Sequence, residues 1–389
     1  MASSPSGRRR LVAGRAAACG LLIALLLPAS HALATCGWTP APAGKDDVKA
    51  LASLSSSDVW AVGYQTQHWD GSNWNLVANP QPNPHDSVLL AVDAVSDSDI
   101  WAAGYQGRIW RRPHSMIQHW NGSSWSIVDD THPSVDGDVL NGIAALSAND
   151  IWAVGFSKQG DDAQNTLVEH WDGTSWTVVP SPNTDRLTNS LEDVLALGPD
   201  DVWAVGSTTG GHHKQRTLAM HWDGIHWSIV HTPNPGDVWD YITAIDGSSA
   251  NDIWAVGDKG YRTHAGYAAI PKTLTLHWDG ATWSVIDSPH VPGKIGDYLN
   301  DVDSIATNDV WAVGTDKAGS STLAIHWDGS AWLTVPTQDP GNSGNWLEAV
   351  SATSSQDVWV AGQRFDTDQD YQGMDPPSTS ATLTEHWGC

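Results

Sequence analysis

The heptapeptide HWDGTSW at residues 170–176 brings together side chains that could do chemistry. A histidine two residues before an aspartate could bind a metal ion, and the two tryptophans could form a pocket for a sugar ring. Near copies stand at 68–74, 119–125, 221–227, 277–283 and 326–332. Chemistry at one site does not require such repetition, whereas a repeated packing position does. We therefore favour a structural role for this motif.

A second motif, DVWAVG or a close variant, accompanies the first along the chain. Its copies begin at Asp58, Asp99, Asp150, Asp201, Asp252, Asp309 and Asp357. Successive copies are 41 to 57 residues apart, and no helical periodicity lies between them. A period near 50 residues with strand patterns predicts a β-propeller or a solenoid.

One period contains four strand-like pieces, for example 190–197, 201–206, 217–222 and 227–230. The last two are joined by a short turn that carries Asp-Gly, which favours a β-hairpin. Four antiparallel strands make one propeller blade. A solenoid would need polar capping repeats at both ends, and none is evident. The seven repeats therefore predict an all-β fold, a seven-bladed β-propeller.

The two ends of the chain predict how the ring closes. The last repeat stops at EHWGC (385–389), and CGW stands at 36–38. Joined end to end, these pieces separate Trp387 from Trp38 by four residues, the spacing of the two tryptophans in the repeated motif. The N-terminal segment is therefore expected to supply the fourth strand of the blade that the C-terminus begins.

This closure would place Cys36 beside Cys389. The third cysteine, Cys19, lies in the N-terminal segment that we interpret as an export signal. An even count in an oxidising compartment favours a disulfide. We predict a Cys36–Cys389 disulfide that closes the ring.

Residues 1–34 have the features of a signal peptide. The basic stretch GRRR (7–10) precedes an apolar run at 16–29, and ALA (32–34) resembles a cleavage site. We expect residues 35–389 to form a single propeller domain that is secreted. No later segment is apolar and long enough to insert into a membrane.

The charge of the chain argues against two classes of partner. Asp and Glu number 44 against 19 Lys and Arg, a formal net charge of -25. A phosphate backbone requires a basic face, so nucleic acid is not expected as a partner. An anionic membrane surface is disfavoured for the same reason.

The layout of the repeat resembles the kelch-type propellers and the propeller domain of galactose oxidases. There too, a strand that ends in glycine is followed by a variable loop, an aromatic residue, a turn and a tryptophan. This chain has the single glycine of AVG where kelch repeats have two, and Trp222 and its equivalents replace the kelch tyrosine. Radical copper chemistry of the galactose-oxidase kind needs a tyrosine cross-linked to a cysteine, and no cysteine is available for it.

Function is expected where the repeats differ, on the face formed by the loops between strands 2 and 3 and between strands 4 and 1. Aromatic residues stand at the entry of strand 1, by the mouth of the central channel, and in one loop between strands 2 and 3. They are Trp239, Tyr241, Tyr298, Trp346 and Trp110. Such residues could stack on sugar rings. Packing of the strand entries is an equally open interpretation.

Carboxylates form a second candidate set. Glu192 and Glu348 share one position, nine residues before the DxW aspartate, and Asp193 and Asp301 share the next. Carboxylates around a channel could be the acid–base pair of a glycosidase. We favour a solvated channel lining over this catalytic interpretation.

The third candidate is a calcium loop in the last blade. Asp366, Asp368 and Asp370 alternate as calcium ligands do, and Asp375 follows them. No glutamate closes the loop, and its glycine stands at position 373 instead of directly behind the ligands. A solvated acidic loop is the favoured alternative, and calcium is the one cofactor that the sequence suggests.

We therefore expect a monomeric, secreted, non-catalytic module that binds an extracellular glycan or protein through the face of the variable loops. Two alternatives stay open. One is a carbohydrate-active hydrolase or lyase that uses the carboxylates at the channel mouth. The other is a structural or adhesion protein of the cell envelope.

Overall fold

The computed structural model describes residues 36–41, 48–82, 86–160, 163–210, 214–262, 269–289, 296–316, 321–367 and 378–388. The predicted signal peptide (1–34) lies outside these ranges. The regular elements of the described residues are β-strands. Within these ranges no helix has the length and apolarity needed to cross a membrane.

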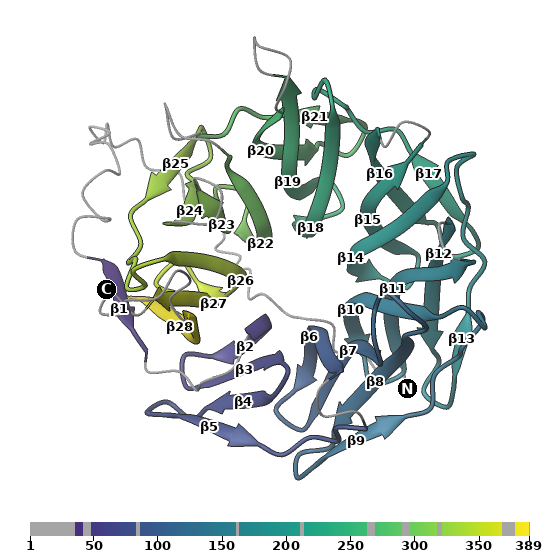
Figure 1. Cartoon of the computed structure of the whole chain (residues 1–389), viewed down its shortest axis with the longest axis horizontal. Coiled ribbons are helices and arrows are strands. Elements are labelled where there is room, and N and C mark those ends of the chain that lie inside the picture. The colour runs from purple at the N-terminus through teal and green to yellow at the C-terminus, as the bar shows by residue number, and fades with distance from the viewer. Residues whose placement is uncertain are drawn as a thin grey trace, which may run out of the picture.

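The described strands form seven four-stranded antiparallel units, which we number as blades 1 to 7 (Figure 1). Blades 1 to 6 comprise β2–β5, β6–β9, β10–β13, β14–β17, β18–β21 and β22–β25, and blade 7 comprises β26, β27, β28 and β1. A parallel pairing of Gln164 with Thr188 joins blades 3 and 4 into one continuous sheet. The predicted seven-bladed β-propeller is confirmed.

In each blade the four strands follow one another from the centre of the ring outward. The innermost strands are β2 (Val48–Ser55), β6 (Ser87–Ser96), β10 (Asp138–Ser147), β14 (Thr188–Gly198), β18 (Trp239–Ser249), β22 (Tyr298–Ala306) and β26 (Gly344–Ser354). The second strands carry the DxW motif and are β3 (Asp58–Gly63), β7 (Asp99–Gln106), β11 (Asp150–Gln159), β15 (Asp201–Thr209), β19 (Asp252–Arg262), β23 (Asp309–Asp316) and β27 (Asp357–Thr367).

The outer half of each blade is the hairpin of the HWDG motif. The third strands are β4 (Thr66–Trp69), β8 (His114–Trp120), β12 (Ala163–Trp171), β16 (Gln215–Trp222), β20 (Ala269–Trp278), β24 (Ser321–Trp327) and β28 (Ser378–Gly388). The outermost strands are β5 (Trp74–Val77), β9 (Trp125–Val128), β13 (Trp176–Val178), β17 (Trp227–Val230), β21 (Trp283–Val285), β25 (Trp332–Val335) and β1 (Gly37–Pro40).

The N-terminal strand β1 completes blade 7, as the two chain ends predicted. It pairs antiparallel with β28, and Gly37 lies opposite Gly388 while Trp38 lies opposite Trp387. Cys36 precedes this ladder directly. Its predicted disulfide partner, Cys389, lies outside the described residues.

The core consists of apolar clusters between consecutive blades. Trp60 of blade 1, for example, packs with Leu89, Met116 and Trp125 of blade 2. Equivalent clusters fill each of the other blade interfaces, including the one between blades 7 and 1. Both faces of the middle strands are therefore buried, which explains why DVWAVG is apolar without alternation.

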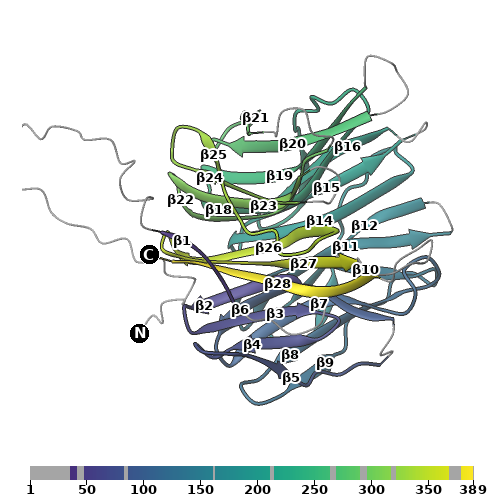
Figure 2. The same ribbon diagram turned by 60° about the vertical axis from the view of Figure 1, so that its left-hand side comes forward.

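The antiparallel connections give the ring two different faces. The turns between strands 1 and 2 and between strands 3 and 4 are short and share one face, which we call the turn face. The connections between strands 2 and 3 and between strands 4 and 1 share the other, which we call the loop face. The strands run from one face to the other across the thickness of the ring (Figure 2).

Candidate functional site

The histidine of each HWDG motif lies beside the DxW aspartate of its own blade. His170 Nε2 is 2.8 Å from Asp150 Oδ1, and the imidazole packs against Trp152 with 4.3 Å between ring centroids. The equivalent nitrogen–oxygen distances in the other six blades are 2.7–2.8 Å. His170 is therefore paired with Asp150. A half-buried imidazole thereby gains the hydrogen bond that it needs.

The remaining residues of the motif build a turn and fill the blade interface. Asp172 Oδ1 accepts the backbone N–H groups of Thr174 and Ser175, and Gly173 has a φ of 94°. Trp171 and Trp176 pack against Trp101 of the preceding blade, at centroid distances of 5.3 and 5.9 Å. The described residues contain no group of three His, Cys, Asp or Glu side chains placed to hold a metal ion. These contacts support a structural role for HWDG.

Glu192 and Glu348 both stand at a β-bulge of the innermost strand. In every blade the register with the second strand shifts by one residue at this position, for example between Leu191 and Asp193. A bulge turns its extra side chain out of the regular alternation. Glu192 accepts a hydrogen bond from Asn141, the bulge residue of blade 3, at 3.2 Å. Glu348 lies 3.4 Å from Nζ of Lys49, the bulge residue of blade 1.

The two glutamates therefore have different surroundings. Burial raises the pKa of Glu192, while hydrogen bonds from Ser190 and Tyr241 act in the opposite direction. Tyr241 belongs to blade 5 and Asn141 to blade 3, so Glu192 contacts residues of both neighbouring blades. Glu348 is instead part of an ion pair with Lys49. Each glutamate is paired with its own neighbour blade, and no contact between the two is observed among the described residues.

Asp193 and Asp301 bridge innermost strands of adjacent blades. Asp193 accepts the backbone N–H of Ile245 in blade 5 at 2.9 Å, and Asp301 accepts that of Val350 in blade 7 at 2.8 Å. Asp93 makes the same 2.8 Å bond to Ala145. Burial raises the pKa of Asp193 to about 7. In Asp93, Asp193 and Asp301 the second carboxylate oxygen accepts the N–H of the following residue, so both oxygens of each carboxylate are engaged.

Three of the five predicted aromatic residues gather around Asp258. The indole N–H of Trp239 donates to Asp258, and the charge of Asp258 acts on both Tyr241 and Tyr298. Burial raises the pKa of Tyr298, and the nearby carboxylate adds to that rise. Trp239, Tyr241 and Tyr298 thus form one cluster at the channel mouth of blades 5 and 6.

The other two predicted aromatic residues lie elsewhere on the ring. Trp346 packs on Phe365 of its own blade at a centroid distance of 4.9 Å, and 37% of its surface is exposed. Trp110 lies in the β7–β8 loop of blade 2 and is 77% exposed. The five residues therefore do not form one continuous arc.

The predicted calcium loop falls mostly outside the described residues. Asp368, Asp370 and Asp375 are in that part of the chain. Asp366 is described: it accepts the backbone N–H of Asn342 at 3.0 Å and lies 3.8 Å from Nε of Arg364.

Two exposed apolar side chains, Trp110 and Val135, lie on two segments of the loop face, and Val135 is 84% exposed. Lys158 of blade 3 bonds to both segments. Its ammonium donates to the backbone carbonyls of Ile109 and Arg111, on either side of Trp110, at 2.7 and 3.3 Å. Its backbone binds the segment of Val135, through Gly137 O and the hydroxyl of Ser134. We call Trp110 and Val135 the Trp110–Val135 patch.

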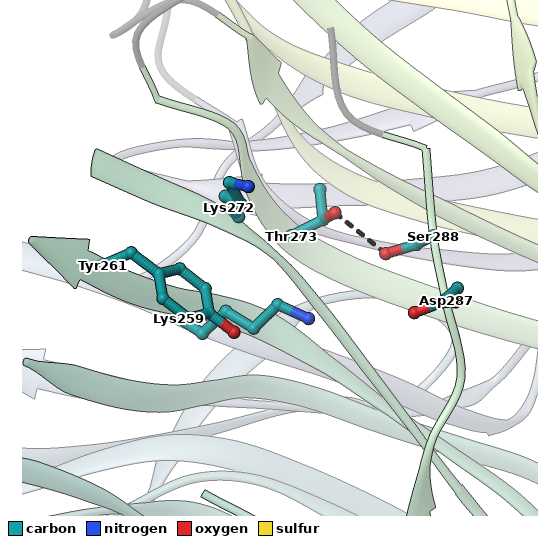
Figure 3. Close-up of a pocket in the computed structure, with 6 residues that line it drawn as sticks. All are labelled: Lys259, Tyr261, Lys272, Thr273, Asp287 and Ser288. Atoms are coloured by element: carbon teal, nitrogen blue, oxygen red, sulfur yellow. Dashed lines mark hydrogen bonds between the residues drawn. The ribbon is translucent and has the colours of Figure 1, made fainter. Parts of the chain in front are cut away.

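A pocket of about 190 Å³ opens in the loop-face half of blade 5 (Figure 3). Its lining comes from β19, β20 and the connection after β21, and consists of Lys259, Tyr261, Lys272, Thr273, Asp287 and Ser288. This pocket was not predicted from the sequence, where carboxylates and aromatic residues were the candidates. The signal that could have indicated it was the presence of two lysines, Lys259 and Lys272, in one hairpin of a strongly acidic chain.

Comparison with known proteins supports the fold. No family model and no curated protein matches the chain. Many solved structures resemble it, among them two with a TM-score of 0.54 and 12% sequence identity over 90% of this chain. One is YCF48 bound to D1 peptide, matched over 96% of its length, and the other is the WD40 β-propeller domain of Doa1, matched over 97%.

These similarities confirm a multi-bladed β-propeller. They are general to propellers, so the likeness of this chain to kelch repeats rests on the layout of its repeat.

Proposed function

We propose that this chain is a secreted, non-catalytic binding module that holds a protein or peptide on its loop face. The observation that carries the proposal is the Trp110–Val135 patch. Its two side chains are the most exposed large apolar residues of the described chain, at 77% and 84%. Exposed apolar groups gathered on one face are typical of interaction sites.

The patch is held in place before any ligand arrives. Lys158 fixes the carbonyls on both sides of Trp110, so the indole is presented on a restrained loop. A restrained aromatic anchor loses little conformational freedom on binding, and tryptophan is enriched among residues that dominate binding energy. A loop restrained by Lys158 that leaves its indole exposed favours recognition over a purely structural role.

Other exposed apolar side chains extend this surface. Tyr64, in the β3–β4 loop of blade 1, is 44% exposed, and Leu187, before β14, is 50% exposed. Both belong to the loop face. On the turn face Ile225, in the β16–β17 turn, is exposed. Trp346 on the innermost strand β26 is 37% exposed, and the other exposed large apolar residues of the described chain lie on outermost strands: Leu76, Ile127, Val178, Ile229 and Leu333.

A protein ligand fits the patch better than a sugar. An indole beside an aliphatic side chain offers few hydrogen-bonding groups, whereas sugar sites place polar groups around an aromatic platform. The aromatic cluster at the channel mouth has such groups, but the indole N–H of Trp239 and the hydroxyl of Tyr241 are already bonded within the protein. The structure of YCF48 with a bound peptide gives a precedent for a propeller of similar fold.

The test is a paired screen of the purified chain against a display library of random peptides and against a glycan array. We expect peptide sequences rich in apolar residues to be enriched, and their binding to be independent of chelator. Enrichment of glycans alone would overturn the proposal in favour of a lectin. A chain that selects neither ligand would support the structural or adhesion alternative.

A further inference from the structure

The pocket in blade 5 contains two lysines that face each other across a strand ladder. Lys259 of β19 is the direct register partner of Lys272 of β20. Directly opposite residues in an antiparallel pair point to the same face, and their Cβ atoms are about 5 Å apart. Like charges in this position are destabilising. The pair is therefore unfavourable unless an anion lies close by.

The protein itself provides only a partial counter-charge. Burial lowers the pKa of Lys259, while the charges of Asp287 and Asp240 act to raise it. Asp240 is already bound to Arg216, at 2.7 Å. Asp287 is exposed at the rim of the pocket. In the described ranges neither lysine has a carboxylate within ion-pair distance, although the chain has a net charge of -25.

The rest of the pocket is suited to a small oxyanion. The Lys272 ammonium lies over the ring of Tyr261, 5.5 Å from its centroid, which restrains the lysine. The hydroxyls of Thr273 and Ser288 are 2.8 Å apart (Figure 3); the buried Thr273 hydroxyl donates to the carbonyl of Pro289, which leaves the Ser288 hydroxyl able to donate to a ligand. A volume of about 190 Å³ is below the size of a pocket for a drug-sized ligand, so it fits a single functional group.

The balance of charges selects among anions. Two ammonium groups and the carboxylate of Asp287 leave one surplus positive charge in the pocket. A singly charged carboxylate matches this balance, whereas a phosphate carries close to two charges. The acidic surface of the whole chain repels polyanions such as nucleic acid and highly sulfated glycans. Both considerations favour an isolated carboxylate on an otherwise apolar or neutral ligand.

We propose that the lysine pocket of blade 5 binds a carboxylate group of a peptide, either an acidic side chain or the C-terminal carboxylate. The inference rests on the proposed function, because the pocket opens toward the loop face that would hold the ligand. The two ammonium groups and the Ser288 hydroxyl bind the carboxylate oxygens. The apolar surface of Trp110 and Val135 then contributes affinity elsewhere on the same face.

The experiment is a titration of the full chain with three capped tripeptides, followed by NMR of ¹³Cε-labelled lysines. The probes are Ac-Ala-Glu-Ala-NH₂, its Gln counterpart and Ac-Ala-Ala-Ala with a free carboxylate. We expect saturable shifts of two lysine signals with one or both acidic probes and none with the Gln probe. The first and third probes distinguish a side chain from a C-terminus. Equal shifts with the Gln probe would overturn the inference.

Three variants with the same charge change provide the control. Lys259→Gln and Lys272→Gln are expected to weaken binding of the acidic probe at least tenfold. Lys214→Gln, an exposed lysine on the same face outside the pocket, is expected to leave it unchanged. An equal loss in Lys214→Gln would mean that net charge alone attracts the probe, which contradicts a pocket. Binding of sodium sulfate without binding of any tripeptide would contradict a carboxylate ligand.

A thermal measurement keeps the test valid if a variant folds poorly. The acidic probe is expected to raise the Tm of the wild-type chain and to have no such effect on Lys272→Gln, whereas the Gln probe changes neither. Asp287→Asn should strengthen carboxylate binding by removing the competing charge. Peptides that bind the loop face with no dependence on carboxylate would defeat this inference alone. Carboxylate binding in the pocket without any selected peptide would defeat the proposed function alone.

Discussion

Trp38 lies directly opposite Trp387 in the ladder between β1 and β28, with their ring centroids 5.4 Å apart. Both indoles also pack on Trp311 of blade 6, at 5.7 and 5.4 Å. The two ends of the chain therefore reproduce the tryptophan pair that a continuous hairpin supplies in the other blades. The ring is closed by the same packing that holds any two of its blades together.

This closure predicts a disulfide between Cys36 and Cys389. Non-reducing peptide mapping of the purified chain should recover the two cysteines in one linked fragment. The chain-entropy model gives a stabilisation of about 5 kcal/mol for so long a loop, as an upper value. Cys36→Ser should therefore lower the Tm markedly, and reductant should lower the wild-type Tm to a similar value. Two free thiols in the oxidised protein would contradict the prediction.

Because the His–Asp pairs are structural, loss of one histidine should lower the free energy of unfolding, and the stability of the chain should not depend on a metal ion. His170→Ala removes the partner of a partly buried carboxylate, Asp150, whose remaining partner among the described residues is the indole N–H of Trp152 at 3.1 Å. We expect a loss of about 1–3 kcal/mol in the free energy of unfolding, measured with urea. His226→Ala, in an exposed turn, is the control and should change it little. A Tm that falls on adding chelator would point instead to a bound metal.

Two buried glutamates predict a decline of stability as the pH rises from about 4.5 toward 8. Burial raises the pKa of Glu169 to about 8 and that of Glu385 to about 7. Because these folded-state values exceed the unfolded value, the stabilising contribution is complete below about pH 4.5 and is lost as the pH rises toward 8. Each group contributes a slope of up to about 1.4 kcal/mol per pH unit while it titrates.

Glu169→Gln provides the matching test. The amide keeps a hydrogen-bonding group beside Thr131 but has no charge to bury. Unfolding curves from pH 5 to 8.5 should be flatter for this variant than for the wild-type chain. Identical pH profiles would show that Glu169 does not titrate in this range.

We expect the glutamates of the innermost strands not to hydrolyse a polysaccharide. Glu192 and Glu348 are each engaged by the neighbouring blade, through Asn141 and Lys49. Glu192→Gln and Glu348→Gln should leave ligand binding unchanged, because these groups hold blades and not ligand. Hydrolysis of a polysaccharide panel by the wild-type chain, lost in either variant, would establish the enzyme alternative.

The sequence was sufficient to predict the ring and its closure, because these depend on repetition. Seven copies of a motif make the period recognisable although single copies vary. The spacing of Trp38 and Trp387 can be counted along the two joined ends of the sequence. The site was harder to predict for a physical reason. The position nine residues before the DxW aspartate is Glu192 in blade 4, Asn141 in blade 3 and Lys49 in blade 1. The sequence does not show that this position is a bulge whose side chain faces the next blade.

The pocket and the apolar patch depend on contacts between blades or within one hairpin. Lys158 and Trp110 are 48 positions apart, and nothing in their local sequence indicates that one holds the loop of the other. Lys259 and Lys272 meet only because the β19–β20 register places them opposite each other. Register and inter-blade distance are three-dimensional properties, so this part of the surface required the structure.

Affinity measurements on variants of the two faces test whether the loop face binds the ligand. The ligand is a peptide selected by the wild-type chain from the random library. Trp110→Ala should weaken its Kd at least tenfold, since an anchoring tryptophan contributes about 2 kcal/mol or more. Lys158→Ala should weaken binding less, because it loosens the loop and keeps the indole.

Ile225→Ala is the matched control, because Ile225 is 71% exposed on the turn face. We expect an unchanged Kd for Ile225→Ala beside the loss in Trp110→Ala. A Kd that is unchanged in Trp110→Ala and weakened in Ile225→Ala would contradict binding on the loop face and place the ligand on the turn face.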